Sequence, residues 1–251
     1  MMIFSFFKMI IAATRSFTAY IVVSLYVLVV APMGMLWVSV VKSPVILYWL
    51  GLQGVRLALA ITGIRFRVKG LEYLNVGSAA VYSVNHTSNV EPPILYLVLA
   101  PLFPRLRILY KAELHKLVVL AQVFDIAGFV PIDRRDREQS LEALEKATAG
   151  LKEGNSFLVF PEGTRSRAGE LLPFKKGGFV MAIKAQVPIV PMAIQGAREA
   201  MRKGSPIIWP VTVSVRLGPP VETAGHEINT RDQLIMKTRR AIEALLAEGP
   251  V

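Results

Sequence analysis

Apolar positions dominate the first 63 residues of the chain. No residue between Ser16 and Val41 is charged. A helix over this segment would be about 39 Å long, which exceeds the roughly 30 Å hydrocarbon core of a bilayer. The pattern therefore predicts a segment that is long enough to span a membrane.

Pro32 and Gly34 interrupt this apolar stretch. A proline inside a helix removes one hydrogen bond and kinks or breaks the helix. A helix–break–helix element that lies in the membrane interface is therefore an alternative to a spanning helix. Ser43-Pro44 breaks the chain again, and Val45 to Gly63 predicts a second apolar helix that carries only Arg56.

From Ile64 onward the pattern changes to short β-prone runs separated by helical patterns, which is typical of an α/β domain. We expect a mixed β-sheet flanked by helices and preceded by a helical, apolar membrane anchor. The expected domains are residues 1–63, membrane-associating helices, and residues 64–251, the catalytic domain. The expected strands are Ile64–Val68, Ala79–Val84, Arg107–Tyr110, Phe129–Ile132, Ser156–Phe160, Ile189–Ile194 and Val211–Leu217.

Two amphipathic patterns predict helices that cover the sheet. The segment from Arg137 to Leu151 places leucines on one face and charges on the other. Near the C-terminus, Thr230 and Gln233 have the spacing of a capping box ahead of a periodic run of apolar residues.

Composition supports an association with membranes. Hydrophobic residues make up 53% of the chain, and the formal net charge is +11. Residues 1–70 contain seven basic residues and no acidic one. Basic charge among apolar runs suits an anionic membrane surface, where each nearby Lys or Arg contributes about 1 kcal/mol. No recognised nucleic-acid motif is present, so no nucleic-acid partner is expected.

The chain contains no cysteine, which excludes disulfides, thiolate metal sites and a cysteine acyl-enzyme.

One polar segment follows the predicted strand that ends at Val84. It contains Asn85-His86 and, five residues after the histidine, Glu91. Ligands of open α/β sheets bind beyond the carboxyl ends of the strands. A carboxylate bonded to one imidazole nitrogen fixes the tautomer and leaves the other nitrogen to accept a proton. The alternative is a strand-end or capping histidine without a chemical role.

A second polar segment, Phe160-Pro161-Glu162-Gly163-Thr164-Arg165-Ser166-Arg167, follows another predicted strand. Pro161 and Gly163 shape a tight turn. Arg165 and Arg167 can bind phosphate through two parallel hydrogen bonds, and Glu162 can accept a hydrogen bond from a hydroxyl group. The alternative is a solvated basic turn.

Together these segments resemble the motifs of the glycerolipid acyltransferases typified by 1-acyl-glycerol-3-phosphate acyltransferases. The resemblance spans about residues 64–220, and the third motif is the most specific. The four motifs, in chain order, are Asn85-His86 with Glu91, Lys111-Ala112-Glu113-Leu114 with Gly128-Phe129-Val130-Pro131-Ile132-Asp133-Arg134, Phe160-Pro161-Glu162-Gly163-Thr164-Arg165, and Val187-Pro188-Ile189-Val190-Pro191.

The resemblance implies acyl transfer from an acyl-CoA or acyl carrier protein to the free hydroxyl of a lysophospholipid, most simply 1-acyl-glycerol-3-phosphate. His86 would be the general base and Glu91 would orient it. No metal or cofactor and no covalent intermediate are implied. The protein would act at a membrane, on its cytoplasmic face. The residues implied to bind the acceptor are Lys111, Arg134, Glu162, Gly163, Thr164 and Arg165.

One position departs from the family, because Glu91 stands where the usual acid is aspartate. The extra methylene requires the loop to adjust, and a displacement of about 1 Å can cost about a hundredfold in rate. Two other functions remain open: acyl transfer to another lyso-lipid, and lipid binding without catalysis.

Overall fold

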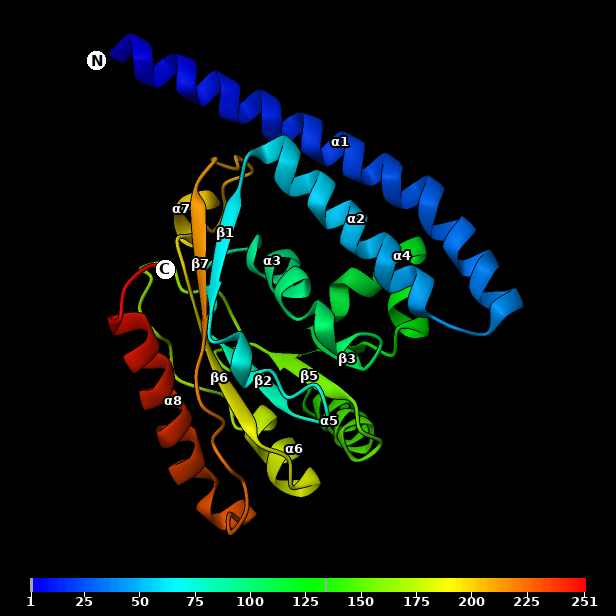
Figure 1. Ribbon diagram of the computed structural model, residues 1–251, viewed down its shortest axis with the longest axis vertical. Coiled ribbons are helices and arrows are strands. Elements are labelled where there is room, and N and C mark those ends of the chain that lie inside the picture. Colours follow the sequence, from blue (N-terminus) through cyan, green and yellow to red (C-terminus); the bar gives the residue numbers. More distant parts are fainter. Residues whose placement is uncertain (1, 134) are drawn as a thin grey trace.

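The computed structural model describes residues 2–133 and 135–251. Two apolar helices precede a seven-stranded sheet with helices on both faces (Figure 1). The helices are α1 (Met2–Val41), α2 (Val45–Thr62), α3 (Glu91–Val98), α4 (Val118–Ile126), α5 (Arg137–Lys152), α6 (Gly177–Ala185), α7 (Ala197–Ala200) and α8 (Arg231–Ala247). The strands are β1 (Arg65–Lys69), β2 (Val81–Val84), β3 (Leu106–Lys111), β4 (Val130–Ile132), β5 (Ser156–Val159), β6 (Ile189–Gln195) and β7 (Thr212–Leu217).

Helix α1 continues through Pro32, so the predicted helix–break–helix alternative is wrong. The proline removes one hydrogen bond, but the helical turns on both sides persist. Gly34 has a packing role, because a Cβ at this position would lie 2.7 Å from the Leu47 Cδ2 atom on α2. The missing side chain lets α1 and α2 approach each other closely.

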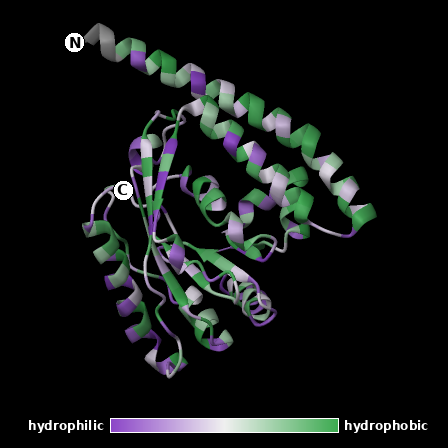
Figure 2. Cartoon of the chain, in the orientation of Figure 1, coloured by the Kyte–Doolittle hydropathy of each residue, from purple (hydrophilic) through white to green (hydrophobic). Residues whose placement is uncertain are grey.

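Both helices are long and apolar enough to cross a membrane by length and composition. In the most apolar 18-residue window of each helix, only 6% of α1 and 28% of α2 is buried against the rest of the protein. Figure 2 shows apolar residues along most of α1. Large apolar side chains such as Phe17, Leu28 and Leu36 are therefore uncovered by the rest of the chain.

The sheet has the strand order β1-β7-β6-β2-β5-β3-β4. All seven predicted strands are present, and their ends differ from the predicted ones by no more than two residues. Strands β6, β2, β5, β3 and β4 are mutually parallel, whereas β7 is antiparallel to β6 and parallel to β1. The mixed α/β fold is thus confirmed.

Two apolar clusters lie on opposite faces of the sheet. One joins the sheet to α3 and the end of α2, with Tyr82 and Leu95 fully buried. The other joins it to α5, α6 and α8, with Leu151 and Phe179 among its members. The predicted helix beginning at Arg137 is α5, which Asp136 caps by accepting from the Glu138 and Gln139 amides.

The predicted capping box of Thr230 and Gln233 is wrong. The Thr230 hydroxyl is bonded instead to the backbone of Glu227, where it closes the short 3-10 turn Ile228–Thr230. Its oxygen therefore does not cap α8, which begins one residue later at Arg231.

Candidate active site

His86 lies in the loop between β2 and α3, at the carboxyl edge of the parallel strands. Its Nδ1 atom is 2.6 Å from the Oε2 atom of Glu91. Glu91 is the first residue of α3 and is fully buried, whereas the His86 side chain is 14% exposed. A carboxylate only accepts hydrogen bonds, so Nδ1 carries the proton and Nε2 is left to act as a base. No hydrogen bond to Nε2 is seen in the described part of the chain.

Three further donors fix the Glu91 carboxylate. Its Oε1 atom accepts from the Thr87 amide at 2.9 Å, the Thr87 hydroxyl at 2.6 Å and the Ser88 amide at 3.0 Å. The start of α3 also favours a negative charge there, because the first amides of a helix have no intrahelical partner. The carboxylate is thus held in place on the loop that carries His86.

The second polar segment is bonded to the first through the backbone of His86. The Glu162 Oε1 atom accepts from the His86 amide at 2.7 Å, and the Ser166 amide donates to the His86 carbonyl at 2.7 Å. The Glu162 Oε2 atom accepts from the Leu172 amide at 2.9 Å. Glu162 is 2% exposed, and both of its oxygens already have backbone partners. Its carboxylate thus joins the backbone of His86 to that of Leu172.

Burial raises the pKa of Glu162 above its ordinary value, although the amides of Leu172 and His86 oppose that rise. Desolvation disfavours the charged form of a carboxyl group, and hydrogen bonds to that form favour it. The net direction shows that burial outweighs the two hydrogen bonds at this position.

The histidine ring and its preceding residue have further supports. The Phe160 ring lies against the imidazole, with centroids 4.1 Å apart. The buried Asn85 side chain donates to the Ile194 carbonyl at 3.0 Å and accepts from the Ile194 amide at 2.8 Å. These bonds tie the histidine loop to β6, the strand that the fourth motif enters.

Arg165 follows β5, the strand beside β2. Within residues 2–133 and 135–251, its guanidinium has no hydrogen bond or ion pair in the structure. Gly163 adopts a φ of 70°, in the left-handed region that favours glycine, and its amide donates to the Phe160 carbonyl at 3.0 Å. Thr164 is exposed beside them. The turn therefore presents a cation next to the histidine loop.

Lys203, which the sequence did not single out, holds this turn from outside. Its Nζ atom donates to the Arg165 carbonyl at 2.8 Å and to the Thr164 hydroxyl at 3.3 Å. The same segment contacts the first polar segment, since the Ser88 hydroxyl donates to the Met201 carbonyl at 2.7 Å. The segment after α7 thus contacts both loops of the site.

Lys111 ends β3, two strands away from β2 in the sheet and therefore roughly 10 Å from it. It forms an ion pair with Glu113 at 3.0 Å, and Arg135 contacts the same carboxylate. These hydrogen bonds lower the pKa of Glu113 to about 2. Lys111 is 61% exposed and remains accessible to an anion. Arg134, another predicted phosphate ligand, lies outside the described residues.

The acyltransferase family profile matches residues 65–195, more than half of the chain, and includes both polar segments. The chain belongs to the acyltransferase family.

Proteins similar in sequence to this chain are also named as acyltransferases. A 1-acyl-sn-glycerol-3-phosphate acyltransferase of Limnanthes douglasii is 33% identical over 71% of this chain and 62% of its own length. One from Cocos nucifera is 34% identical over 68% of this chain and 54% of its length. An uncharacterized acyltransferase of Schizosaccharomyces pombe is 31% identical over 76% of this chain and 69% of its length. The chain therefore spans less than two thirds of the first two relatives.

The fold of this acyltransferase also matches a solved structure. The crystal structure of the 1-acyl-sn-glycerophosphate acyltransferase PlsC from Thermotoga maritima superposes with a TM-score of 0.78. The match covers 95% of this chain and 98% of that one at 24% identity. The likeness extends over nearly the whole chain and so includes the two apolar helices.

The acyltransferase site places a held imidazole beside a cationic turn. The histidine can remove a proton from a hydroxyl group because Nδ1 is fixed as a donor and Nε2 is free. Among residues 2–133 and 135–251, no group of three or more His, Asp or Glu side chains could hold a metal ion.

Several positioning residues had no visible signal in the sequence. Thr87 and Ser88 donate their backbone amides to Glu91, as any residue except proline could, and only the Thr87 hydroxyl adds a side-chain bond. Lys203 lies 38 residues after Arg165 and reaches it only through the fold. The one available hint was Ser166, which directly follows the third motif and bonds the His86 carbonyl.

Proposed function

We propose that this acyltransferase transfers a fatty acyl group to the free hydroxyl of 1-acyl-glycerol-3-phosphate and so forms phosphatidic acid. The observation that carries the proposal is the buried Glu91 carboxylate bonded to His86 Nδ1 at 2.6 Å, with Nε2 left unbonded. The relatives named for this reaction support the choice of acceptor. The donor would be the thioester of coenzyme A or of acyl carrier protein.

The proposed reaction needs one base and no covalent enzyme intermediate. His86 Nε2 takes the proton of the acceptor hydroxyl while the hydroxyl oxygen forms a bond to the thioester carbonyl carbon. The carbon–sulfur bond then breaks, and the leaving thiolate takes the proton back from Nε2. The products are the new ester and the free thiol, and His86 returns to its starting state. Glu91 stabilises the imidazolium that exists between the two proton transfers.

The proposed phosphate contacts come from cations along the carboxyl edge of the sheet. Arg165, beside the histidine loop, can bind the acceptor phosphate with two hydrogen bonds, and Lys111 can add a point charge. Arg134 remains a further proposed phosphate ligand. Lys203 supports this assignment because it fixes the backbone of Arg165. Gly163 and Thr164 would border the glycerol part of the acceptor.

We also propose that α1 and α2 hold the protein on a membrane, with the site on the cytoplasmic face. The 6% burial of the α1 window supports this, since apolar surface of that extent otherwise faces water. The acceptor would reach the site from the lipid, and the thioester donor would arrive from the aqueous side.

The test is an acyltransferase assay of purified protein in neutral detergent. Labelled acyl-CoA and acyl carrier protein thioesters are offered with lysophosphatidic acid, lysophosphatidylcholine, lysophosphatidylethanolamine or no acceptor. The variants are His86→Ala and, as a matched control, His226→Ala, whose ring contacts Thr230 and Lys237 in a polar loop.

We expect transfer with the highest kcat/KM for lysophosphatidic acid, lost in His86→Ala and retained in His226→Ala. A higher kcat/KM for another lyso-lipid would replace the acceptor and keep the chemistry. Transfer that does not depend on His86, or no transfer to any lyso-lipid, would refute the proposal.

A further inference from the structure

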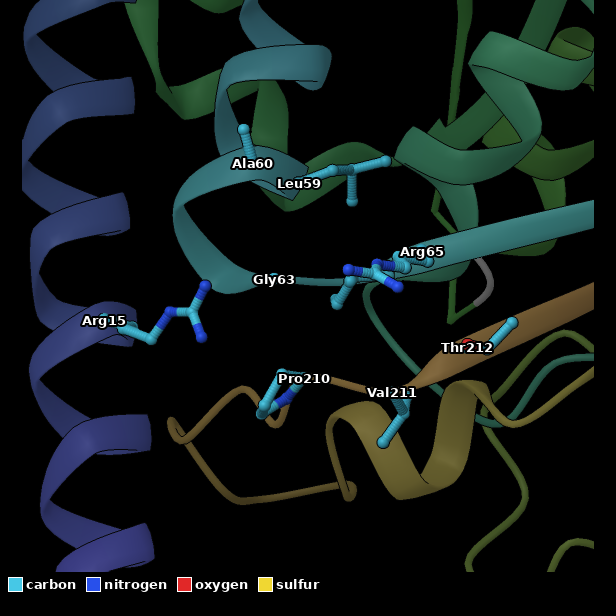
Figure 3. Close-up of a pocket in the computed structure, with 9 residues that line it drawn as sticks. Arg15, Leu59, Ala60, Gly63, Arg65, Pro210, Val211 and Thr212 are labelled. Carbon is cyan, nitrogen blue, oxygen red and sulfur yellow. The ribbon is translucent and has the colours of Figure 1, made fainter.

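A polar groove lies where the apolar helices join the sheet. It has a volume of about 520 Å³, a size typical of sites for small ligands. Figure 3 shows its walls, which come from α1, the end of α2 and the starting ends of β1 and β7. None of the lining residues is acidic: they are Arg15, Leu59, Ala60, Gly63, Ile64, Arg65, Pro210, Val211 and Thr212.

Two arginines from different elements line this groove. Figure 3 shows the Arg15 side chain extending from α1 toward the Gly63 turn, with Arg65 at the start of β1 on the other side of that turn. The Arg15 Nε atom donates to the Ile61 carbonyl at 2.8 Å, which fixes the guanidinium against the end of α2.

Gly63 makes room for the Arg15 head group. A Cβ at Gly63 would lie 2.6 Å from the Arg15 Nη2 atom, and the φ of 76° is itself in the region that favours glycine. Any side chain at this position would displace the guanidinium. The turn therefore leaves room for the Arg15 guanidinium because position 63 has no side chain.

Neither guanidinium has a carboxylate partner in the described part of the chain. The sequence offers none nearby along the chain, since residues 1–70 contain no Asp or Glu. Arg65 is exposed and makes no side-chain hydrogen bond in residues 2–133 and 135–251. Two positive charges that share a groove repel each other, and a bound anion would relieve that repulsion.

The groove lies at the same end of the sheet as the candidate active site, where β2 and β6 finish and β1 and β7 begin. Strand β7 is antiparallel to β6, so its first residues lie beside the end of β6 and the start of α7. The segment between α7 and β7 is also bonded to α1: the Tyr20 hydroxyl donates to the Pro206 carbonyl and the Ile208 amide to the Ser16 hydroxyl, each at 2.7 Å. The groove is therefore bordered by the apolar helix on one side and by the site-bearing edge on the other.

We propose that Arg15 and Arg65 bind a phosphate group in this groove. Guanidinium groups present paired N–H donors that match phosphate oxygens, and the Thr212 hydroxyl on the groove wall can add a donor. The phosphate has two chemically plausible sources, the head group of a membrane lipid and the coenzyme A moiety of a soluble thioester. The exposed apolar surface of α1 beside the groove favours the lipid, because head groups lie where an apolar helix surface meets water.

The experiment measures binding by titration calorimetry on the full chain in neutral detergent, so it requires no acyl transfer. The probes are dioctanoyl phosphatidic acid, dioctanoylglycerol as the phosphate-free control, coenzyme A and inorganic phosphate. All proteins carry Arg165→Gln, which weakens phosphate binding at the candidate active site. Arg65→Gln and Arg15→Lys are then compared with Arg56→Gln, which removes the same charge from an exposed position on α2.

We expect Arg65→Gln to weaken binding of a phosphate probe about tenfold or more, the loss of a hydrogen bond between charged groups. Arg56→Gln should leave binding unchanged, and dioctanoylglycerol should not distinguish the variants. A loss confined to phosphatidic acid identifies a lipid head group, and a loss confined to coenzyme A identifies the thioester. Arg15→Lys keeps the charge but loses the planar fork, so it should give an intermediate loss.

Equal binding by the Arg65→Gln and Arg56→Gln proteins with every phosphate probe would overturn the proposal. Unfolding temperatures measured for each variant show whether the fold is intact. Arg65 has no side-chain hydrogen bond among the described residues, so its variant is expected to remain folded. The result is independent of the proposed reaction, because a protein without transferase activity can still bind phosphate through these arginines.

Discussion

In the Glu91→Gln variant, an amide group replaces one carboxylate oxygen while the shape of the side chain is kept. The amide oxygen can still accept from the amides of Thr87 and Ser88, which places its NH2 group next to His86 Nδ1. Nδ1 must then accept a hydrogen bond. The ring proton moves to Nε2, the nitrogen that would otherwise act as the base.

The size of the effect follows from the contact that is lost. A hydrogen bond to a charged group contributes about 1.5–3 kcal/mol, which corresponds to a rate factor of about ten to 150. The wrong tautomer adds to this loss, since the Asp→Asn change in a serine protease triad costs about ten-thousandfold. Because Glu91 is fully buried, water cannot replace it. We therefore expect kcat to fall about a hundred- to ten-thousandfold, with little change in either KM.

Initial rates with labelled acyl-CoA and lysophosphatidic acid measure this effect, with the unfolding temperature recorded for each variant. Glu72→Gln, the same chemical change on an exposed side chain, is the control and should keep its activity. Glu91→Asp retains the negative charge and reaches Nδ1 once α3 shifts toward the histidine, so it should keep substantially more activity than Glu91→Gln, and Glu91→Ala should lose most of it. A folded Glu91→Gln protein with wild-type kcat would refute the orienting role of Glu91.

Three further outcomes are expected. The raised pKa of Glu162 means that the folded protein holds the Glu162 proton more tightly than the unfolded chain does. The protonated carboxyl group therefore adds to the free energy of unfolding. This stabilisation is fully present below about pH 4.5 and is lost as the pH rises through the raised value. Glu162→Gln should lack that part of the pH dependence of the unfolding temperature, and identical curves would contradict it. Arg165→Gln should raise the KM for lysophosphatidic acid about ten- to hundredfold and leave that for acyl-CoA unchanged, and an equal rise in both would exclude a phosphate contact. Lys203→Met should raise the acceptor KM by less than Arg165→Gln does, and Lys203→Arg should restore it; if both variants behave as wild type, Lys203 has no positioning role.

The fold could be predicted from the sequence because its strands are short β-prone runs with clear ends. Each predicted strand is present, since apolar runs such as Val81–Val84 and Ser156–Val159 leave little choice of structure at the centre of a sheet. The continuity of α1 was one of two alternatives that the sequence left open. Pro32 indicates a break by its local chemistry, but packing against α2 at Gly34 supports the helix on both sides.

The site was predictable where the spacing itself carries the information. A histidine at a strand end and an acid five residues later predicted the contact between His86 and Glu91, which the structure contains. The groups that the Glu162 carboxylate contacts could not be predicted. Its carboxylate could equally face a substrate or the backbone, and only the fold places the amides of His86 and Leu172 within reach.

The glutamate at position 91 can be explained by how the loop and α3 meet. Helix α3 begins at Glu91 itself and continues with two prolines, which suit a helix start because the first amides have no intrahelical partner. From that position the carboxylate must reach back over the loop, where one oxygen accepts from Thr87 and Ser88 and the other from His86. An aspartate would be one methylene short of that reach unless α3 moved toward the histidine. The glutamate side chain thus spans the distance from the start of α3 to the loop. Its four donors keep the carboxylate an acceptor, so it orients the imidazole and the transferred proton stays on His86.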